Sequence, residues 1–339
     1  MPPVPAFDLI AIGDSALNVF LHIHEATLQC QLHREQCLLC LEYANKIPVQ
    51  SVTKVPGSGS GPNIALGAAK LGMKSAIVTT LGNDEVAQEI LRAWKKHGVS
   101  DVYVRMDSKH ETDYATVLDY AHERTILAYN RPKPYALPAV DGATWVVYAA
   151  VGKKHERMEK QLLAHLKKNP EQKLAFNPGI EHMHRNLDAL KPVIARSDLF
   201  IVNEEEAIRL LEDGDRPLHN LLLSFHHLGA KIVVITDGKN GSYATDGHEF
   251  WSCPIFPGKA VESTGAGDAF ATGFIYALHH KHSIQEAMRY GTANSWSVIQ
   301  KIGAHEGQLS KKIMATVLKK FNKIQPRLEP SDGFLPAQE

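Results

Sequence analysis

Residues 198–236 read DLFIVNEEEAIRLLEDGDRPLHNLLLSFHHLGAKIVVIT, in which two short apolar runs flank a helical segment. The runs at 198–202 and 231–236 have the length and composition of buried strands. Similar apolar runs at 144–149 and 173–176 precede them, again separated by helical stretches. Strands that alternate with helices are typical of a parallel sheet with right-handed crossovers. The sequence therefore predicts an α/β fold with a mostly parallel central sheet.

The same alternation extends toward both ends of the chain. FDLIAIGD (7–14) and SAIVTTLG (75–82) are predicted as buried strands, and EVAQEILRAWKKHG (85–98) as a helix that ends at a glycine. Further helices are expected near 266–280, 283–300 and 310–322. Helices on both faces of the sheet give a three-layer domain, which we place at residues 1–325.

Two segments interrupt this alternation. Residues 18–24, 50–55, 112–120 and 124–130 alternate apolar and polar positions, as half-buried strands do. We expect them to pair into a small β-strand lid, carried by insertions at about 15–56 and 108–131. The last segment, 326–339, contains Pro326, Pro330 and Pro336 and is predicted to be irregular.

Composition excludes several classes of protein. The chain has 339 residues, with 37 Lys and Arg against 37 Asp and Glu, which disfavours a protein that coats nucleic acid. No apolar run approaches the roughly 18 residues that span a bilayer. The N-terminal sequence MPPVPAFDLIAIGD lacks the charge and apolar run of a secretory signal. We expect a cytoplasmic protein without nucleic-acid or membrane partners.

The stretch ESTGAGDAF (262–270) opens a predicted helix. Small residues at Gly265, Ala266 and Gly267 leave backbone N–H groups accessible at the positive end of the helix, which suits a bound anion. Asp268 lies within one turn of these groups, where its carboxylate can accept a proton from a hydroxyl that attacks a phosphate. The alternative is a glycine-rich turn with an ordinary first-turn acid.

Three other glycine or acidic segments follow strands or precede helices. Asn203 and Glu206 open a helix after DLFIV, where they either organise Mg²⁺ beside phosphates or cap the helix. TDGKNG (236–241) is a tight turn that allows close approach of a nucleotide. GSGSGPN (57–63) matches neither the P-loop nor the dinucleotide fingerprint, and GDSALN after the first strand excludes a Rossmann-type oxidoreductase.

Together these segments resemble the ribokinase/PfkB family of carbohydrate and nucleoside kinases. STGAGDAF resembles the C-terminal signature of the family, SGSGPN (58–63) the N-terminal glycine signature, Asn203…Glu206 the NxxE motif and TDGKNG the nucleotide-binding turn. The resemblance implies a ribokinase-like fold, ATP as co-substrate, Mg²⁺, and transfer of the γ-phosphoryl group to a sugar-like hydroxyl. It also implies a homodimer formed through the lid.

The resemblance carries over to individual positions. It implies Asp268 as the catalytic base, with Gly265, Ala266 and Gly267 as the anion hole. The implied substrate contacts are Asp14, Asn18, Gly59, Ser60 and Asn63; the nucleotide contacts are Asn203, Thr236, Gly238, Gly241 and Asn294; the metal contacts are Glu206 for Mg²⁺ and Glu262 and Thr264 for a monovalent cation such as K⁺.

The acceptor is left open by the sequence. The family often has Asp where Asn18 stands, and its signature usually begins with Asp where Glu262 stands. A sugar is the leading acceptor, and a nucleoside is the alternative because Asn18 is neutral and the lid is apolar. A sugar phosphate would require Arg131, Arg105 or Lys109 to reach the pocket. A silent nucleotide or sugar sensor is disfavoured by the intact Asp268.

Cys30, Cys37 and Cys40 crowd into the excursion between two predicted lid strands. The spacing of Cys37 and Cys40 resembles half of a zinc site, with His33 nearby. A structural Zn²⁺ is one interpretation, and three reduced cysteines that pack as small apolar groups are the other.

Overall fold

A ten-stranded sheet forms the middle layer of the chain in this computed structural model, which describes residues 7–30, 37–120, 123–214 and 217–330. From β7 to β13 neighbouring strands pair in parallel, and the edge from β13 to β16 is antiparallel. The spatial order is β16 (Arg327–Glu329), β15 (Phe250–Cys253), β14 (Ser242–Thr245), β13 (Ile232–Thr236), β12 (Leu199–Asn203), β11 (Lys173–Phe176), β10 (Trp145–Tyr148), β1 (Leu9–Ile12), β6 (Ser75–Gly82) and β7 (Ser100–Asp107). The predicted α/β class with a mostly parallel sheet is confirmed.

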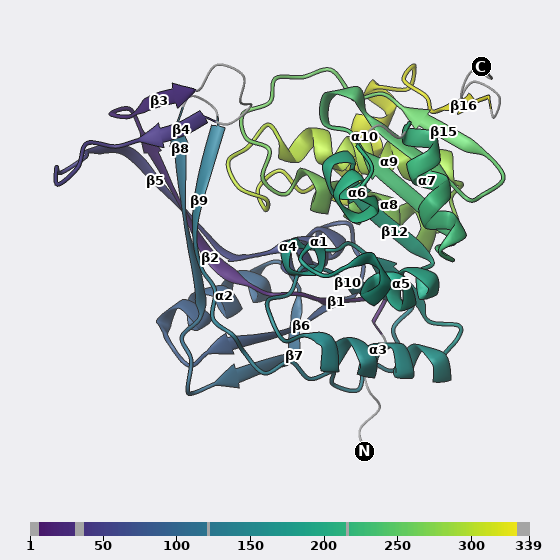
Figure 1. The fold of residues 1–339 in the computed structure, drawn as a ribbon, viewed down its shortest axis with the longest axis horizontal. Coiled ribbons are helices and arrows are strands. Elements are labelled where there is room, and N and C mark those ends of the chain that lie inside the picture. Colours follow the sequence, from purple (N-terminus) through teal and green to yellow (C-terminus); the bar gives the residue numbers. More distant parts are fainter. Residues whose placement is uncertain (1–6, 31–36, 121–122, 215–216, 331–339) are drawn as a thin grey trace.

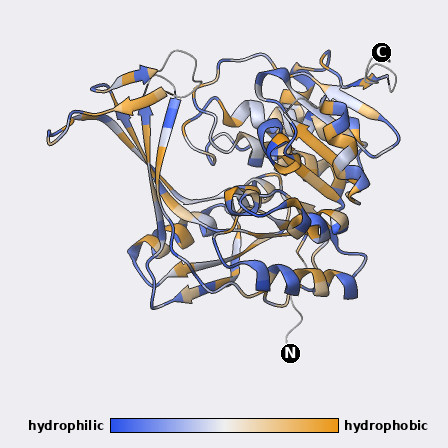
Figure 2. Cartoon of the chain, in the orientation of Figure 1, coloured by the Kyte–Doolittle hydropathy of each residue, from blue (hydrophilic) through white to orange (hydrophobic). Residues whose placement is uncertain are grey.

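Helices cover both faces of this sheet because successive strand residues point to opposite sides. Leu9 and Ala11 pack into one buried cluster, and Ile10 and Ile12 into another. The central strands are mostly hydrophobic (Figure 2). One face packs against α1 (Ser60–Lys70), α2 (Glu85–Lys96), α8 (Ala266–His279), α9 (Ile284–Val298) and α10 (Lys311–Lys320); the other packs against α3 (Glu156–Lys168), α5 (Leu187–Arg196), α6 (Glu204–Leu211) and α7 (Leu218–His227). The short helix α4 (Ile180–Met183) precedes α5.

A second sheet stands off the three layers as the predicted lid (Figure 1). Among the described residues it has four strands in the order β5 (Val49–Ser58), β2 (Ala16–Ile23), β8 (Asp113–Tyr120) and β9 (Glu123–Tyr129). Strands β2 and β8 pair in parallel, so the lid is a mixed sheet. A separate hairpin of β3 (Thr27–Cys30) and β4 (Cys37–Cys40) extends from the end of the lid. Residues 31–36 and 121–122 of the expected lid lie outside the described residues.

The sequence prediction missed two edge strands. β7 extends the parallel sheet beyond β6. β16 lies in the segment that was expected to be irregular, and it pairs with β15. Pro326 and Pro330 bracket this strand, but the three residues between them keep their N–H groups and can pair with the open edge of β15. Residues 1–6 and 331–339 lie outside the described residues. Within the described chain, every helix is too short or too polar to cross a membrane.

Candidate active site

Gly265 sets the geometry at the N-terminus of α8. It is the N-cap residue and has a left-handed backbone, with φ at 77°. A Cβ built at Gly265 would lie 2.3 Å from the Cβ of Ala304, so this turn requires glycine. The turn brings the helix end against the 301–304 loop.

The first turn of α8 presents backbone donors. The N–H of Ala266 donates to Ser263 O (3.1 Å), whereas the N–H groups of Gly267 and Asp268 precede the regular intrahelical bonds. Both N–H groups lie at the positive end of a 14-residue helix. The predicted anion hole thus coincides with a helix N-terminus whose unbonded backbone donors are those of Gly267 and Asp268 rather than Ala266.

Two side chains from the start of α1 hold the Asp268 carboxylate. Ser60 Oγ lies 2.6 Å from Asp268 Oδ1, and Asn63 Nδ2 donates to Oδ2 at 2.6 Å. Burial raises the pKa of Asp268 above its ordinary value, and these two hydrogen bonds oppose the rise. Ser60, Asn63 and Asp268, which the sequence singled out in two distant segments, are thus in direct contact.

Two residues outside the motifs, Asn177 and His305, contact the side chains of Ser60 and Asn63. Asn177 Oδ1 lies 3.0 Å from Ser60 Oγ, and Asn177 Nδ2 donates to Ile201 O (3.1 Å). His305 Nε2 donates to Asn63 Oδ1 (3.0 Å), and burial lowers the pKa of His305 to about 3, so the imidazole is neutral. Asn177 directly follows β11, at the carboxyl end of a parallel strand, where ligands of such sheets bind. This position is the sequence feature that could have identified Asn177 as a site residue.

An acidic pocket lies beside the α1 N-terminus. Asp14 Oδ2 accepts hydrogen bonds from Tyr135 OH (2.6 Å) and Gly152 N (2.7 Å). Lys133 Nζ lies 3.4 Å from Asp14 Oδ1 and 2.6 Å from Asp113 Oδ2. Burial raises the pKa of Asp113, and the charge of Lys133 opposes the rise. Lys133 is therefore a buried cation shared by two carboxylates.

Gly59 connects this pocket to the N-terminus of α1. Its φ is 140°, and a Cβ there would lie 2.1 Å from Asp14 O. Gly59 immediately precedes Ser60, so Asp14 lies next to the residues that hold Asp268. Asn18 lies in β2 opposite Val55 and Ala115, further out on the lid.

A cavity of about 350 Å³ opens beside the α8 N-terminus. Among the predicted nucleotide and anion-hole residues, its lining includes Thr236, Gly238, Gly241, Ala266 and Gly267. Its far wall is apolar and includes the side chains of Ile255, Phe256, Phe270, Trp296 and Ile299. A flat aromatic ring against the apolar wall and an anion at the helix end would together fit a nucleotide.

Asn294 does not contribute to this cavity, contrary to the prediction from the resemblance. It is fully buried, where Nδ2 donates to Ala269 O and Gln308 Oε1 and Oδ1 accepts from Leu309 N. An amide with its donors and acceptor satisfied inside the core is a structural link between α8, α9 and the following loop. Ser295 and Trp296 of the same helix face the cavity instead.

Asn203 and Glu206 form a reciprocal capping box at the start of α6. Asn203 Oδ1 accepts from Glu206 N (2.7 Å), and Glu206 Oε2 accepts from Asn203 N (3.0 Å). Burial raises the pKa of Glu206, and the negative charge of Asp268 adds to the rise. The helix-capping interpretation is therefore correct for both residues.

Glu262 and Thr264, the predicted monovalent-cation residues, precede the anion hole. Glu262 Oε1 accepts from Thr264 N (2.6 Å) and from the guanidinium of Arg124 (3.1 Å). Arg124 comes from lid strand β9 and was not singled out from the sequence. Its guanidinium also contacts Ser263 Oγ.

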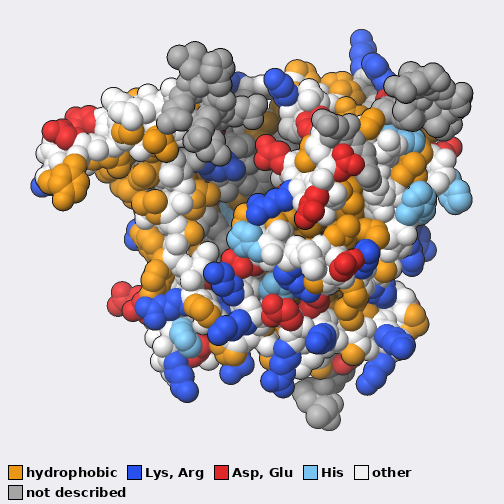
Figure 3. Space-filling model, in the orientation of Figure 1, with side chains coloured by type: hydrophobic (Ala, Val, Ile, Leu, Met, Phe, Trp, Pro, Cys, Tyr) orange, Lys and Arg blue, Asp and Glu red, His pale blue; other side chains and the backbone are white. Residues whose placement is uncertain are grey.

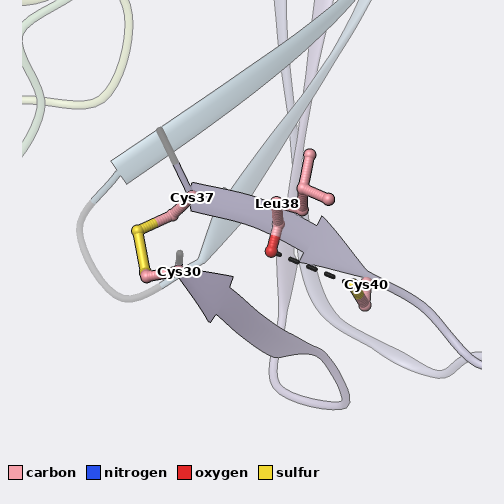
Figure 4. Close-up of a disulfide and its surroundings, with 4 residues drawn as sticks. All are labelled: Cys30, Cys37, Leu38 and Cys40. Carbon is pink, nitrogen blue, oxygen red and sulfur yellow. Dashed lines mark hydrogen bonds between the residues drawn. A yellow bond between two sulfur atoms is a disulfide. The ribbon is translucent and has the colours of Figure 1, made fainter. Parts of the chain in front are cut away.

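The cysteine cluster does not have the arrangement of a zinc site. Cys30 and Cys37 form a disulfide across the β3–β4 hairpin, and Cys40 Sγ contacts Leu38 O (Figure 4). Opposite positions in an antiparallel hairpin bring the two sulfurs together, which the spacing alone did not predict. Cys30 and Cys37 are oxidised and exposed, so the interpretation as three reduced cysteines that pack as small apolar groups is also wrong.

One group of metal-ligating side chains does occur among the described residues: His155, Glu159 and His182, all buried. Arg185 donates to both Glu159 oxygens (2.7 and 3.0 Å) and lies 3.1 Å from His155 Nε2. This guanidinium already supplies the cation that the carboxylate needs. The group is best explained as a structural ion-pair network.

Comparisons with known proteins identify the family and agree with the fold. A profile of pfkB family carbohydrate kinases matches residues 23–311. The ATP-dependent 6-phosphofructokinase of Thermoanaerobacterium thermosaccharolyticum is 25% identical over 284 residues, 79% of this chain and 86% of that protein. Arabidopsis thaliana ribokinase, solved with ribose and ATP, superposes with a TM-score of 0.77 at 22% identity over 93% of this chain and 99% of its own. A Methanocaldococcus jannaschii nucleoside kinase superposes with a TM-score of 0.74 at 18% identity over 94% and 100%.

Proposed function

The chain belongs to the pfkB family of carbohydrate kinases, and from this we propose that it transfers the γ-phosphoryl group of ATP to a hydroxyl of an uncharged sugar. The observation that carries the proposal is the position of Asp268. Asp268 lies in the first turn of α8, and its carboxylate is held by Ser60 and Asn63 of α1. Ala266 and Gly267, in the same turn of α8, line the nucleotide cavity. A proton acceptor and an anion site therefore adjoin each other.

In the proposed mechanism, Asp268 accepts the proton of the acceptor hydroxyl while that oxygen attacks the γ-phosphorus. A bond forms between the acceptor oxygen and the γ-phosphorus, and the bond to the β,γ-bridging oxygen breaks, so ADP leaves with the electron pair. The N–H groups of Gly267 and Asp268 stabilise the charge on the transferring phosphoryl group. The proton on Asp268 returns to solvent after product release.

The acidic residues fit a divalent cation. Glu206 lies near enough to Asp268 for the negative charge of Asp268 to help raise the pKa of Glu206. Mg²⁺ bound to ATP would neutralise phosphate charge, and Glu206 and Asn203 are the residues that would hold it, through its water shell. Their own part is to fix the position of the phosphates relative to the α8 N-terminus.

The charge of the acceptor pocket favours an uncharged substrate. Lys133 is paired with Asp113 and Asp14, and its side chain is only 6% exposed. Asp14, Asp113 and Asp268 thus outnumber the one buried cation, which disfavours a phosphate monoester. Asp14 Oδ1 has no hydrogen bond among the described residues besides its 3.4 Å ion pair with Lys133, so it can accept one from a sugar hydroxyl. A sugar phosphate depends instead on the exposed Arg105, which lines a second cavity of about 200 Å³ beside Asp14.

A nucleoside is the second candidate acceptor. Phe20, Val55 and Val117 form a buried apolar cluster on the lid face toward Gly303. This cluster is closed by its own packing, so the nucleoside alternative rests on the neutral amide of Asn18. Asn18 would contact either acceptor through a neutral amide.

An ADP-release assay with ATP and Mg²⁺ tests the proposal. The acceptors are a panel of sugars, nucleosides and sugar phosphates, and the Asp268→Asn variant is the control for contaminating kinases. Turnover with uncharged sugars that the variant lacks supports the proposal. Turnover only with nucleosides or only with sugar phosphates overturns the acceptor class, and absence of turnover while ATP binds contradicts the kinase mechanism.

We also propose a homodimer formed through the outer lid face. Val52 and Leu127 are exposed on lid strands β5 and β9, and hydrophobic side chains gather over the arm that the lid forms (Figure 3). A pair of lids would bury this surface. Light scattering after size exclusion tests it, and Leu127→Asp is expected to give a monomer. The cytoplasmic location stays a prediction of the sequence.

A further inference from the structure

The carboxylate of Glu262 is enclosed by hydrogen-bond donors from three parts of the chain. Oε1 accepts from Thr264 N and Arg124 Nη1, and Oε2 accepts from Gly303 N at 3.3 Å. The side chain is only 8% exposed. A buried carboxylate needs a compensating positive charge, and Arg124 supplies it.

Arg124 links the lid to the loop that shapes the anion hole. It belongs to β9, and its guanidinium bonds both Glu262 and Ser263. Ser263 lines the nucleotide cavity, and two residues later Gly265 caps α8. The position of the loop therefore depends on contact with the lid.

Gly303 adds a second contact between the same parts. It donates to Glu262, and a Cβ at Gly303 would lie 2.7 Å from the side chain of Val55 on lid strand β5. Glu262 thus lies at a junction where the lid, the 301–304 loop and the anion-hole loop meet.

We propose that Arg124 fills the role of a monovalent cation at this loop and positions the anion hole when the lid is closed. A cation such as K⁺ needs several oxygen ligands, but the guanidinium of Arg124 already lies against Glu262 Oε1 and would repel a second cation there. Thr264 Oγ1 is buried without a hydrogen-bond partner among the described residues, and one hydroxyl does not make a cation site. The residues therefore do not fit the monovalent cation that the resemblance implies. The inference rests on the proposed kinase function.

Two consequences follow. Nucleotide binding and phosphoryl transfer are independent of K⁺, because the positive charge beside Glu262 is the guanidinium of Arg124, which is part of the chain. Acceptor binding and ordering of the anion hole are coupled, because the lid that covers the acceptor also carries Arg124. Arg124 acts through Glu262 and Ser263, so it is a positioning residue.

The test compares Arg124→Ala and Arg124→Lys with the wild-type chain in KCl and in tetramethylammonium chloride at equal ionic strength. Lys54→Ala is the matched control, since Lys54 is an exposed cation of lid strand β5. One readout is the affinity for a non-hydrolysable ATP analogue with Mg²⁺, measured by calorimetry. The others are kcat and the KM values with the acceptor found in the panel.

The wild-type affinity and kcat are expected to change by less than about twofold between the two salts. Arg124→Ala is expected to lose roughly 10- to 100-fold in kcat, the loss typical of a charge-assisted hydrogen bond, with smaller changes in KM. K⁺ or low guanidinium chloride should restore part of this loss and tighten analogue binding. Arg124→Lys should keep most of the activity.

Two results overturn the inference: activation of wild-type analogue binding or turnover by K⁺ of more than about tenfold, or an Arg124→Ala variant that matches Lys54→Ala in every readout. Analogue binding needs no acceptor. A chain that turns over no acceptor but binds the analogue therefore refutes the proposed function alone, while the salt comparison still decides the role of Arg124.

Discussion

Asp268→Asn is the substitution that separates the chemistry of the site from its architecture. Ser60 Oγ lies between Asp268 Oδ1 and Asn177 Oδ1, at 2.6 and 3.0 Å. An amide at position 268 can donate to Ser60 Oγ while the Ser60 hydroxyl rotates to donate to Asn177. The amide oxygen can still accept from Asn63. Every hydrogen bond is thus retained, and only the charge and the basicity are lost.

The expected loss of turnover is about 10²- to 10⁴-fold, the usual contribution of a general base. This corresponds to roughly 3–5 kcal/mol of transition-state stabilisation. The melting temperature is expected to stay equal or to rise, because the raised pKa of Asp268 means that its ionised form is disfavoured in the folded chain. The assays are ADP release, analogue calorimetry and thermal unfolding. Turnover within about tenfold of wild type in a folded variant would falsify the assignment of the base, and a large drop in melting temperature would refute the hydrogen-bond argument.

Three further perturbations follow from the same contacts. Lys133→Met leaves two facing carboxylates without a cation, so urea unfolding should show a loss of about 3–5 kcal/mol. Gly265→Ala forces a left-handed residue against Ala304 and should weaken analogue binding in calorimetry by about 5- to 160-fold, from roughly 1–3 kcal/mol of strain. Burial lowers the pKa of His305 to about 3, so the unfolded chain alone binds its proton below about pH 6.5. Stability should therefore fall by about 1.4 kcal/mol per pH unit as pH drops from 6.5 toward 3, and His305→Asn should remove that part of the slope in pH-dependent urea unfolding.

The sequence predicted the parts of the site that local chemistry specifies. A glycine at 265 and small residues before Asp268 predict a helix N-terminus with accessible backbone donors, and α8 begins there. The apolar runs at 75–82 and 173–176 became β6 and β11 with the predicted bounds, because a strand buried on both faces is apolar throughout.

Residues whose roles depend on distant partners were not predictable in this way. His305 and Tyr135 lie in loops without a motif, and nothing near them in sequence indicates that they bond Asn63 and Asp14. Asn294 shows the opposite failure. A polar residue in a predicted helix fits a binding role and a buried structural role equally well, and only the packing of α8 against α9 decides between them.

The position of Asp268 also explains how one carboxylate can be both ionised and basic. A first-turn location in α8 and hydrogen bonds from Ser60 and Asn63 stabilise the ionised form, while burial destabilises it. Burial is the larger effect, so the pKa lies above that of an exposed aspartate and the carboxylate holds a proton more strongly. Activity should accordingly be lost as pH falls through this raised pKa. Ser60→Ala removes one stabilising hydrogen bond and should move that loss to higher pH, and a pH–rate profile that stays in place would show that another group limits the rate.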